Sequence, residues 1–300
     1  MTKEELSRLV AQLLEEMPPE PMTKGAYAEP EQRKEVRNDY HDGDFVPDVT
    51  QLDLRKLYLV ENGAEKEKFR AMKLRTPARL GSGRAGARYK TLTMLRFRAD
   101  HAAAQDAVFS EIGAEFAKEN DLLPVKTRCK DKEEYLTRPD LGRCFDEHNA
   151  KTIAGVIDRP PRVQIVVGDG LSSAAITANA MDCLAAIRDG LKLRGIELGK
   201  SIFVKYCRVG AGDAVGDITG CELVCVLVGE RPGLVTDKSM SAYITYKPHT
   251  GVSESARTVV SNIHAQGTPA VEAGAYIAEL IGRILEKKVS GVAFAVEGAG

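Results

Sequence analysis

The chain has 300 residues, of which 43% are hydrophobic and 28% charged, and its 42 basic and 43 acidic side chains leave a formal net charge of −1. This composition is typical of a globular protein with a sizeable buried core. The balanced charge argues against wholesale binding to nucleic acid or membranes, and no apolar run approaches the roughly 18 residues of a membrane span.

The first 17 residues have the pattern of an amphipathic helix. Thr2 and Glu5 form a capping-box arrangement, and Pro18 ends the helix because proline removes a backbone donor. Between them, apolar residues recur at helical spacing: Leu6, Leu9, Val10, Leu13, Leu14 and Met17. Residues 18–53 are rich in Pro, Glu, Asp and Lys, which predicts a flexible linker. A short helix on such a tether is typical of a docking element, and the alternative is a helix that packs back on its own chain.

Residues 54–158 are predicted to form a mainly helical domain that contacts a partner. Its segment 71–99 has no acidic residue and is rich in glycine and in basic residues: Lys73, Arg75, Arg79, Arg84, Arg88, Lys90, Arg96 and Arg98. Arginine offers planar donors for phosphate or carboxylate groups. Three interpretations stay open: contact with an anionic cofactor or acidic protein, contact with nucleic acid, or a solvated face paired with the chain's own acids. The thin aromatic content and neutral overall charge disfavour nucleic acid.

Two helices are expected in the rest of this domain. Apolar residues at helical spacing predict one helix over 100–119. Thr137 is the expected cap of the second, which is predicted to end near Asp158.

A proline cluster at 159–161 marks the expected start of an α/β domain that spans residues 159–296. Apolar runs predict strands at 163–167, 201–209, 223–228 and 240–246, and a glycine turn and a helix to about Leu193 follow the first. Thr268 is the expected cap, and Pro269 the expected first residue, of a last helix that ends near Lys288. The predicted fold is therefore α/β, with a Rossmann-like, doubly wound, mostly parallel sheet, a smaller helical N-terminal domain and a tethered N-terminal helix. Such sheets bind ligands at the carboxyl ends of their strands.

The glycine turn after the first predicted strand matches a dinucleotide-binding fingerprint only weakly. Gly168 and Gly170 are followed by Ser173 where the fingerprint has glycine or alanine, and the second strand lacks the acid that binds a ribose hydroxyl. Asp169 is therefore interpreted as a residue that orders the turn. The sequence has no nucleophile elbow, Walker A loop or HExxH motif, and its six cysteines lack the paired spacing of a metal site. These features favour a binding subunit with no catalytic residue and no metal ligand of its own.

Six motifs in the same order resemble the light (small) subunit of ethanolamine ammonia-lyase. They read TPARLGSGRAGARY at 76–89, YLTRPDLGR at 135–143, QIVVGDGLSS at 164–173, GERPGL at 229–234, SAYITY at 241–246 and SNIHAQGTP at 261–269. The resemblance covers residues 54–291. It is specific because several linked motifs extend over most of the chain.

The resemblance implies a subunit that pairs with a heavy TIM-barrel chain, usually as six copies of each, with adenosylcobalamin between the two chains. The heavy chain would bind ethanolamine and carry the catalytic residues. Cobalt–carbon homolysis would start a radical conversion of ethanolamine to acetaldehyde and ammonia, since the cofactor carries the difficult chemistry. The light chain would hold the cofactor at the interface and be inactive alone.

The resemblance also implies cofactor contacts at Val209, Glu230 and Val259. Val209 and Glu230 follow predicted strands, where α/β sheets bind ligands. Glu230 can accept hydrogen bonds from corrin amides, and the alternatives for it are an ion pair with Arg231 or a contact within the turn. Some relatives have cysteine at the position of Val259, so a backbone or packing contact is expected there.

Modules that replace the lower base of cobalamin with a histidine carry a DxHxxG motif, which this sequence lacks. The segment 39–43 has the wrong spacing, and the required glycine does not follow His148. The cofactor is therefore expected to keep its own dimethylbenzimidazole as lower ligand. By the same resemblance, the helix at 1–17 is expected to direct the enzyme to the shell proteins of a bacterial microcompartment in the cytoplasm.

Overall fold

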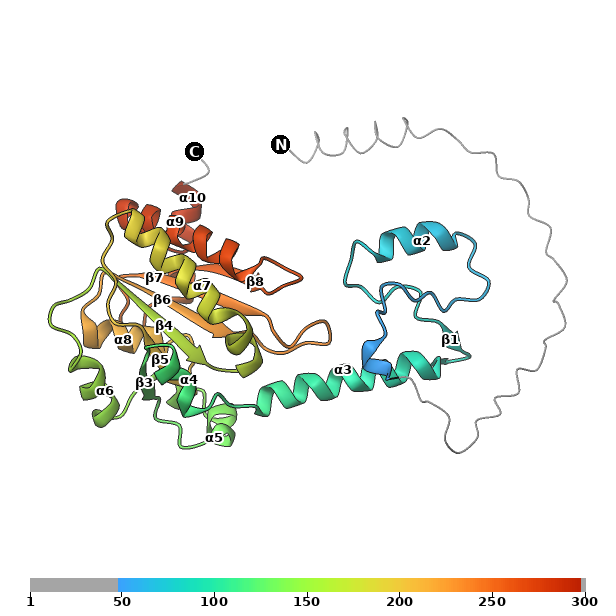
Figure 1. The fold of residues 1–300 in the computed structure, drawn as a ribbon, viewed down its shortest axis with the longest axis horizontal. Helices are drawn as coiled ribbons and strands as arrows, with labels where there is room; N and C mark the ends of the chain where they lie inside the picture. The colour runs from blue at the N-terminus through green and yellow to red at the C-terminus, as the bar shows by residue number, and fades with distance from the viewer. Residues whose placement is uncertain (1–47, 298–300) are drawn as a thin grey trace, which may run out of the picture. The chain divides into compact units, whose positions relative to one another are not determined.

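A computed structural model describes residues 48–297 of the chain. These residues belong to one compact unit that begins at Asp48, and Figure 1 shows their helices and strands. The helix predicted at 1–17 and most of the linker predicted at 18–53 lie outside the described residues. No helix within 48–297 is long and apolar enough to cross a membrane.

The centre of the structure is a six-stranded sheet with the strand order β3-β5-β4-β6-β7-β8. Its strands are β3 (Leu123–Lys126), β4 (Val163–Asp169), β5 (Ile202–Lys205), β6 (Leu223–Gly229), β7 (Met240–Tyr246) and β8 (Arg257–Ile263). The first four strands in this order run parallel, whereas β7 is antiparallel to β6 and β8 is antiparallel to β7. The predicted α/β class with a mostly parallel sheet is therefore confirmed.

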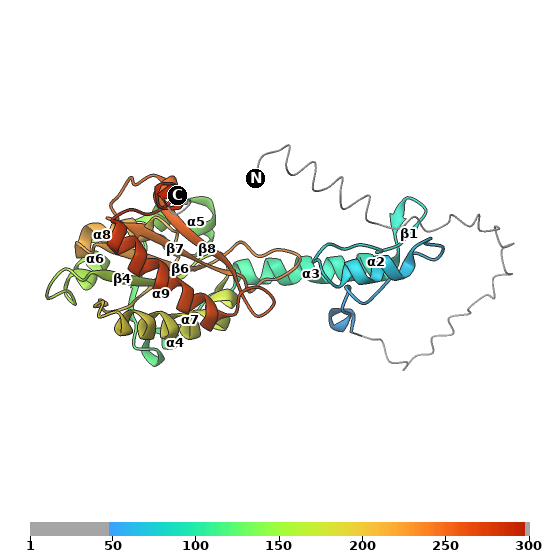
Figure 2. The same ribbon diagram turned by 90° about the horizontal axis from the view of Figure 1, so that it is seen from above.

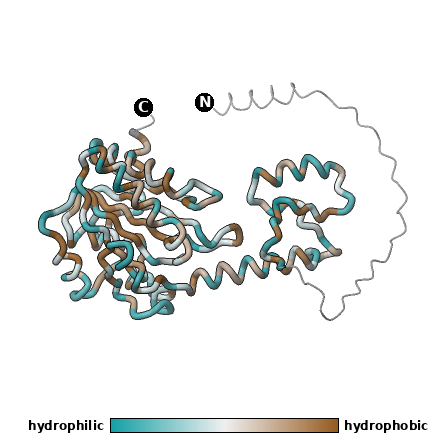
Figure 3. The backbone as a smooth tube through the Cα atoms, in the orientation of Figure 1, coloured by the Kyte–Doolittle hydropathy of each residue, from teal (hydrophilic) through white to brown (hydrophobic). Residues whose placement is uncertain are grey.

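Helices cover both faces of the sheet. On one face, α7 (Ser173–Leu193) and α9 (Ala270–Lys287) pack side by side and bury an apolar cluster against β4, β6 and β7 (Figures 1 and 2). On the other face, α6 (Glu147–Ala154) and α8 (Ala211–Thr219) cover a second cluster that includes residues of β5 and β6. Every position of β4 and β6 is buried, which explains why their sequences are mostly apolar (Figure 3).

The arginine-rich region precedes the sheet in the chain. Its elements are η1 (Val49–Gln51), α2 (Lys66–Lys73), the antiparallel strands β1 (Arg84–Ala85) and β2 (Arg88–Tyr89), and α3 (Thr91–Phe109). The remaining elements are α4 (Ala114–Glu119), α5 (Lys132–Thr137), η2 (Leu141–Arg143), η3 (Glu254–Ala256) and α10 (Val292–Glu297). Figure 3 shows that the arginine-rich region is more hydrophilic than the central strands.

Two predicted elements end earlier than expected. The helix predicted over 100–119 is split into α3 and α4, because the backbone N–H of Ile112 donates to the carboxylate of Asp169 at 3.0 Å instead of to a helical carbonyl. The strand predicted at 201–209 ends at Lys205, because Tyr206 has a φ of 58°. The hydroxyl of Tyr206 donates to Glu111 Oε1 at 2.8 Å, which helps to hold this left-handed conformation.

The six-stranded sheet contains two strands that were not predicted, and the structure corrects two helix caps. β3 is a four-residue edge strand that includes Pro124, and β8 mixes buried and exposed positions. Thr137 is the last residue of α5 and does not cap α6; the side chain of Asp146 does, by accepting from the backbone N–H of Asn149 at 2.8 Å. Pro269, not Thr268, stands at the N-cap of α9.

Candidate functional site

The carboxyl ends of β4, β5 and β6 meet at one edge of the sheet because these strands are parallel. β7 starts and β8 ends at the same edge, since each runs antiparallel to the strand before it. The loops that follow β4, β5, β6 and β8 therefore gather there. This is the edge at which α/β sheets bind ligands.

Val209 lies at this edge, in the turn between β5 and α8. Its side chain is half-buried and packs against the apolar cluster that α8 covers. The turn is held by the neighbouring segment, because the backbone N–H of Arg208 donates to the carbonyl of Gly142 at 2.9 Å. One Arg208 side-chain nitrogen also donates to the carbonyl of Tyr135 at 2.8 Å. Two hydrogen bonds from Arg208 therefore hold the turn that carries Val209.

Glu230 directly follows β6 and is half-buried. Its carboxylate accepts hydrogen bonds from the hydroxyl of Ser239 at 2.8 Å, from the hydroxyl of Ser241, and from the backbone N–H of Asn262 at 3.4 Å. Within the described residues it makes no ion pair with Arg231, which was one alternative for its role. The two serines belong to the chain that turns back into β7, so the turn itself orients the carboxylate.

Val259 lies in the middle of β8 and pairs with Tyr243 on β7. Its side chain is 44% exposed, which is high for a valine in a sheet. Alternate residues of a strand point to the same face, so Val259 shares its face with Ser261. The hydroxyl groups of Ser241 and Ser261 lie 3.0 Å apart, and because Ser241 donates its one proton to Glu230, it accepts from Ser261. A chain of hydroxyl groups therefore connects Glu230 to the strand face that carries Val259.

The three predicted contact residues all belong to the face of the sheet that α8 covers. Val209 and Tyr243 both pack against the apolar cluster on that face, and Val259 pairs with Tyr243. The roles of Ser239, Ser241 and Tyr243 were not predicted from the sequence. The polar residues Ser241, Tyr243 and Thr245 alternate with apolar residues along β7, and this spacing of two indicates a strand with one polar face. Burial raises the pKa of the Tyr243 hydroxyl, and the nearby charge of Glu230 adds to this effect.

A buried polar cluster fixes the loop that follows β4. The carboxylate of Asp169 is 1% exposed and accepts from the backbone N–H of Ile112 at 3.0 Å and from the hydroxyl of Ser173 at 2.6 Å. Burial raises the pKa of Asp169 and lowers the pKa of the Lys132 ammonium. Lys132 donates to the carbonyl of Gly170 at 2.8 Å. The interpretation of Asp169 as a residue that orders the turn is therefore confirmed.

The same loop packs closely against other segments of the chain. A Cβ on Gly170 would lie 2.8 Å from a methyl carbon of Val228 and 2.9 Å from the carbonyl oxygen of Cys207. This glycine is thus needed for internal packing. The start of α7 is capped by Ser172, whose hydroxyl accepts from the backbone N–H of Ala175 at 3.0 Å.

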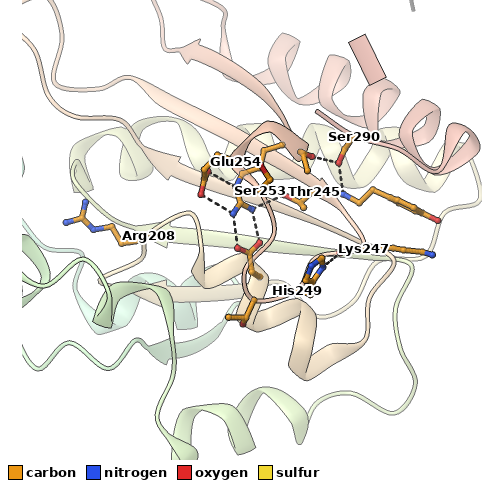
Figure 4. A network of polar contacts seen from close by, with 12 residues as sticks. Arg208, Thr245, Lys247, His249, Ser253, Glu254 and Ser290 are labelled. Atoms are coloured by element: carbon orange, nitrogen blue, oxygen red, sulfur yellow. Dashed lines mark hydrogen bonds and ion pairs between the residues drawn. The ribbon is translucent and has the colours of Figure 1, made fainter. Parts of the chain in front are cut away.

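An ion-pair network anchors α8, the helix that begins just after Val209 (Figure 4). Arg257 on β8 donates to both carboxylate oxygens of Asp213 in the first turn of α8, and also to Glu254 and Thr245. These bonds raise the pKa of the Arg257 guanidinium, which stays charged. The network therefore fixes the position of α8 relative to β7 and β8.

Neither thiols nor metal ligands are arranged for chemistry in residues 48–297. No group of three or more His, Cys, Asp or Glu side chains there could hold a metal ion. Cys207 is fully buried near the sheet edge, and burial raises the pKa of its thiol. A buried thiol with a raised pKa is a poor nucleophile because little of it is ionised.

The comparisons with known proteins all identify the same family. The family model of the ethanolamine ammonia-lyase light chain (EutC) matches residues 66–295. A protein of Clostridium perfringens, named ethanolamine ammonia-lyase small subunit, is 55% identical over 287 residues, which are 96% of each chain. Proteins with the same name from Clostridioides difficile and Listeria monocytogenes are 55% and 53% identical over 292 residues, or 97% of this chain and 99% of each relative.

Proposed function

The chain belongs to the ethanolamine ammonia-lyase light-chain family, and from this premise we propose that it is the light subunit of an adenosylcobalamin-dependent ethanolamine ammonia-lyase. The observation that carries the proposal is the similarity over nearly the full length of relatives that are named small subunits. A small subunit implies a larger partner chain, and we propose that this partner is a heavy TIM-barrel chain. The complete enzyme would be a carbon–nitrogen lyase that acts on ethanolamine.

The residues of the candidate site are suitable for holding a corrinoid. A carboxylate has about four lone-pair sites. The hydrogen bonds to Glu230 from Ser239, Ser241 and Asn262 use three of them, which leaves one oxygen able to accept from a corrin amide. The Tyr243 hydroxyl lies on the same face and makes no hydrogen bond within the described residues. Val209 and Val259 would supply apolar contact at the two sides of this surface.

The light chain would bind and orient the cofactor and exclude water from its side of the interface. Bound adenosylcobalamin would supply the radical that starts the conversion of ethanolamine to acetaldehyde and ammonia. We place the catalytic residues on the heavy chain, since this chain's candidate site holds no acid–base pair aimed at a shared cavity. The light chain alone is therefore proposed to be inactive.

The function is tested by co-expressing the chain with a heavy subunit and measuring acetaldehyde release from ethanolamine, with adenosylcobalamin present or omitted. Activity that requires both chains and the cofactor is the expected result. Co-purification of the two chains is the matching physical readout. If the chains neither co-purify nor turn over ethanolamine, the proposed function is wrong.

We also propose that the cofactor keeps dimethylbenzimidazole as its lower ligand. The reason is the absence of a DxHxxG motif from the sequence. In addition, both ring nitrogens of His264, a histidine at the carboxyl edge, are hydrogen-bonded within the chain. An EPR spectrum of the complex with bound cob(II)alamin should show coupling to the nitrogen of the cofactor's own base. Coupling to a protein nitrogen that disappears on histidine substitution would contradict this.

The remaining parts of the proposal concern organisation. We propose that the enzyme has six heavy and six light chains and is located in a cytoplasmic microcompartment. Within the light chain, we propose a Rossmann-like domain at 159–296 and a mainly helical partner-contact domain at 54–158.

We also propose that the helix predicted at 1–17 binds shell proteins and that the linker at 18–53 tethers this helix to the rest of the chain. Deletion of residues 1–17 should abolish co-purification with shell proteins while ethanolamine turnover is kept. Unchanged co-purification would contradict the targeting role.

A further inference from the structure

A groove of about 630 Å³ lies beside the candidate cofactor site. One wall comes from the arginine-rich region and includes Arg75, Arg79 and Arg96. The other wall comes from the carboxyl edge of the sheet and includes Leu234 in the loop after β6 and Asn262 near the end of β8. The backbone N–H of Asn262 also donates to Glu230 at 3.4 Å, so the groove adjoins the proposed corrin contact.

Two guanidinium groups in the groove share one carboxylate. Asp100 accepts from Arg79 at 2.7 Å and from Arg96 at 2.9 Å. Arg79 also donates to the carbonyl of Leu234, which ties the two walls of the groove together. Arg79 Nη1 and Arg96 Nε are buried without a hydrogen-bond partner. Each guanidinium has five donors, so the cluster has more donors than acceptors and one unit of positive charge in excess.

The other charged groups of the groove increase this excess. Asp53 is neutralised by Arg55, with 3.1 Å between Arg55 Nε and Asp53 Oδ1. Arg75 is exposed and, within the described residues, its side chain makes no hydrogen bond or ion pair. Both ring nitrogens of His264 are engaged within the chain: Nδ1 accepts from the backbone N–H of Gln266, and Nε2 lies 2.7 Å from Asn262 Oδ1. The groove is therefore a cationic surface whose acids are already paired.

We propose that this groove is a phosphate-binding subsite that takes the phosphodiester of the nucleotide arm of the corrinoid. The inference rests on the proposed function and extends it to the arginine-rich region. Guanidinium groups bind phosphate through planar, paired donors. A phosphodiester carries one negative charge, which would balance the excess positive charge of the Arg79, Arg96 and Asp100 cluster. The link through Asn262 to Glu230 puts the groove next to the surface where the corrin ring is proposed to lie.

The test uses the complex of heavy and light chains and two cyano-corrinoids. Cyanocobalamin has the nucleotide arm with its phosphodiester, whereas dicyanocobinamide lacks it. Equilibrium affinities for both are measured on the wild-type complex, on Arg75→Gln and on Arg98→Gln. Arg75 is chosen because it makes no contact that the fold needs, and Arg98 is the matched control because it is exposed in α3 and does not line the groove.

The expected result is about tenfold weaker binding of cyanocobalamin by Arg75→Gln, which corresponds to the loss of one charge-assisted hydrogen bond. Its affinity for dicyanocobinamide, and both affinities of Arg98→Gln, should equal those of the wild type. Equal weakening of both corrinoids by Arg75→Gln, or no weakening, overturns the subsite.

Two further outcomes identify other occupants and also overturn the assignment. If inorganic phosphate raises the melting temperature of the cofactor-free complex while the wild type binds both corrinoids equally well, the groove binds a free anion. If Arg75→Gln instead weakens association of the two chains, the groove binds acidic side chains of the partner.

If the wild-type complex binds no corrinoid at all, the proposed function itself is wrong, and the subsite is overturned with it.

Discussion

Arg257 and Asp213 form a buried, two-pronged ion pair in which the guanidinium donates to both carboxylate oxygens, at 2.7 and 2.8 Å. The two side chains are 3% and 7% exposed. Arg257 comes from the first position of β8 and Asp213 from the first turn of α8. The pair therefore connects the strand that carries Val259 with the helix that begins beside Val209.

Removal of one partner of this pair should strongly destabilise the fold. In Arg257→Met the carboxylate of Asp213 stays buried without a counter-charge, and we expect a loss of about 3–5 kcal/mol in the free energy of unfolding. Chemical denaturation of the purified chain measures this. The control is Arg159→Met, which breaks the exposed ion pair with Glu197 and should cost at most about 1 kcal/mol. Equal effects of the two variants would show that the buried pair has no special role.

The hydroxyl groups around Glu230 should matter for cofactor binding. In Ser241→Ala the carboxylate of Glu230 loses one of its donors, and its orientation becomes less restricted. We expect cyanocobalamin to bind the assembled complex about threefold to tenfold more weakly, the equivalent of one ordinary hydrogen bond. Ser261→Ala is the control, because Ser261 bonds Ser241 and not Glu230. A larger effect of Ser261→Ala than of Ser241→Ala would contradict this role.

The sequence predicts the buried strands better than the edge strands, for a physical reason. β4 and β6 have long apolar runs because neighbouring strands and helices cover all of their positions. β3 is short and includes Pro124, and the polar residues of β8 reflect its exposed face. Edge strands carry a weaker hydrophobic signal because one side of the strand lacks a partner.

The candidate site is predictable only in part from local patterns. The positions of Val209 and Glu230 follow from the rule that ligands bind after strands of a parallel sheet. The bonds from Ser239 and Ser241 to Glu230 depend on the antiparallel pairing of β7 with β6, and an apolar run does not show the direction of a strand. The groove between Arg79 and Leu234 joins segments that are far apart in the chain, so no local motif predicts it.

The buried carboxyl group of Asp169 should make stability depend on pH. Burial raises its pKa in the folded state, so between the ordinary value of about 3.9 and the raised value the folded state binds more protons than the unfolded state. The free energy of unfolding contributed by this group therefore falls as the pH rises through that window. Asp169→Asn, which cannot ionise, should gain stability relative to the wild type over the same window and then stay at a constant difference.

The measurement is denaturant unfolding of the wild type and of Asp169→Asn at a series of pH values. Asp182→Asn is the control, because Asp182 is exposed on α7. If Asp182→Asn showed the same pH-dependent difference from the wild type, the effect would not be specific to the buried carboxyl group. A pH-independent difference for Asp169→Asn would show that Asp169 ionises in the folded chain as it does in the unfolded chain.

Two glycines of α9 should respond in opposite directions to the same substitution. A Cβ on Gly274 would lie 2.5 Å from the carbonyl oxygen of Cys183 and 2.7 Å from the Cβ of Ala186, both on α7. In Gly274→Ala the two helices must move apart, and we expect a loss of about 1–3 kcal/mol. A Cβ on Gly282 would meet only the flexible side chain of Arg194, at 3.3 Å or more. Gly282→Ala should therefore stabilise the chain by about 0.5–1 kcal/mol, because alanine loses less backbone entropy in a helix.

Denaturant unfolding of both variants in parallel tests this pair, and circular dichroism checks that the helix content is kept. The comparison isolates the contact between α7 and α9, because the chemical change and the helix are the same in both variants. If Gly274→Ala is as stable as Gly282→Ala, α7 and α9 do not approach as closely at Gly274 as the structure places them. The packing that holds one whole face of the sheet would then have to come from the larger apolar side chains alone.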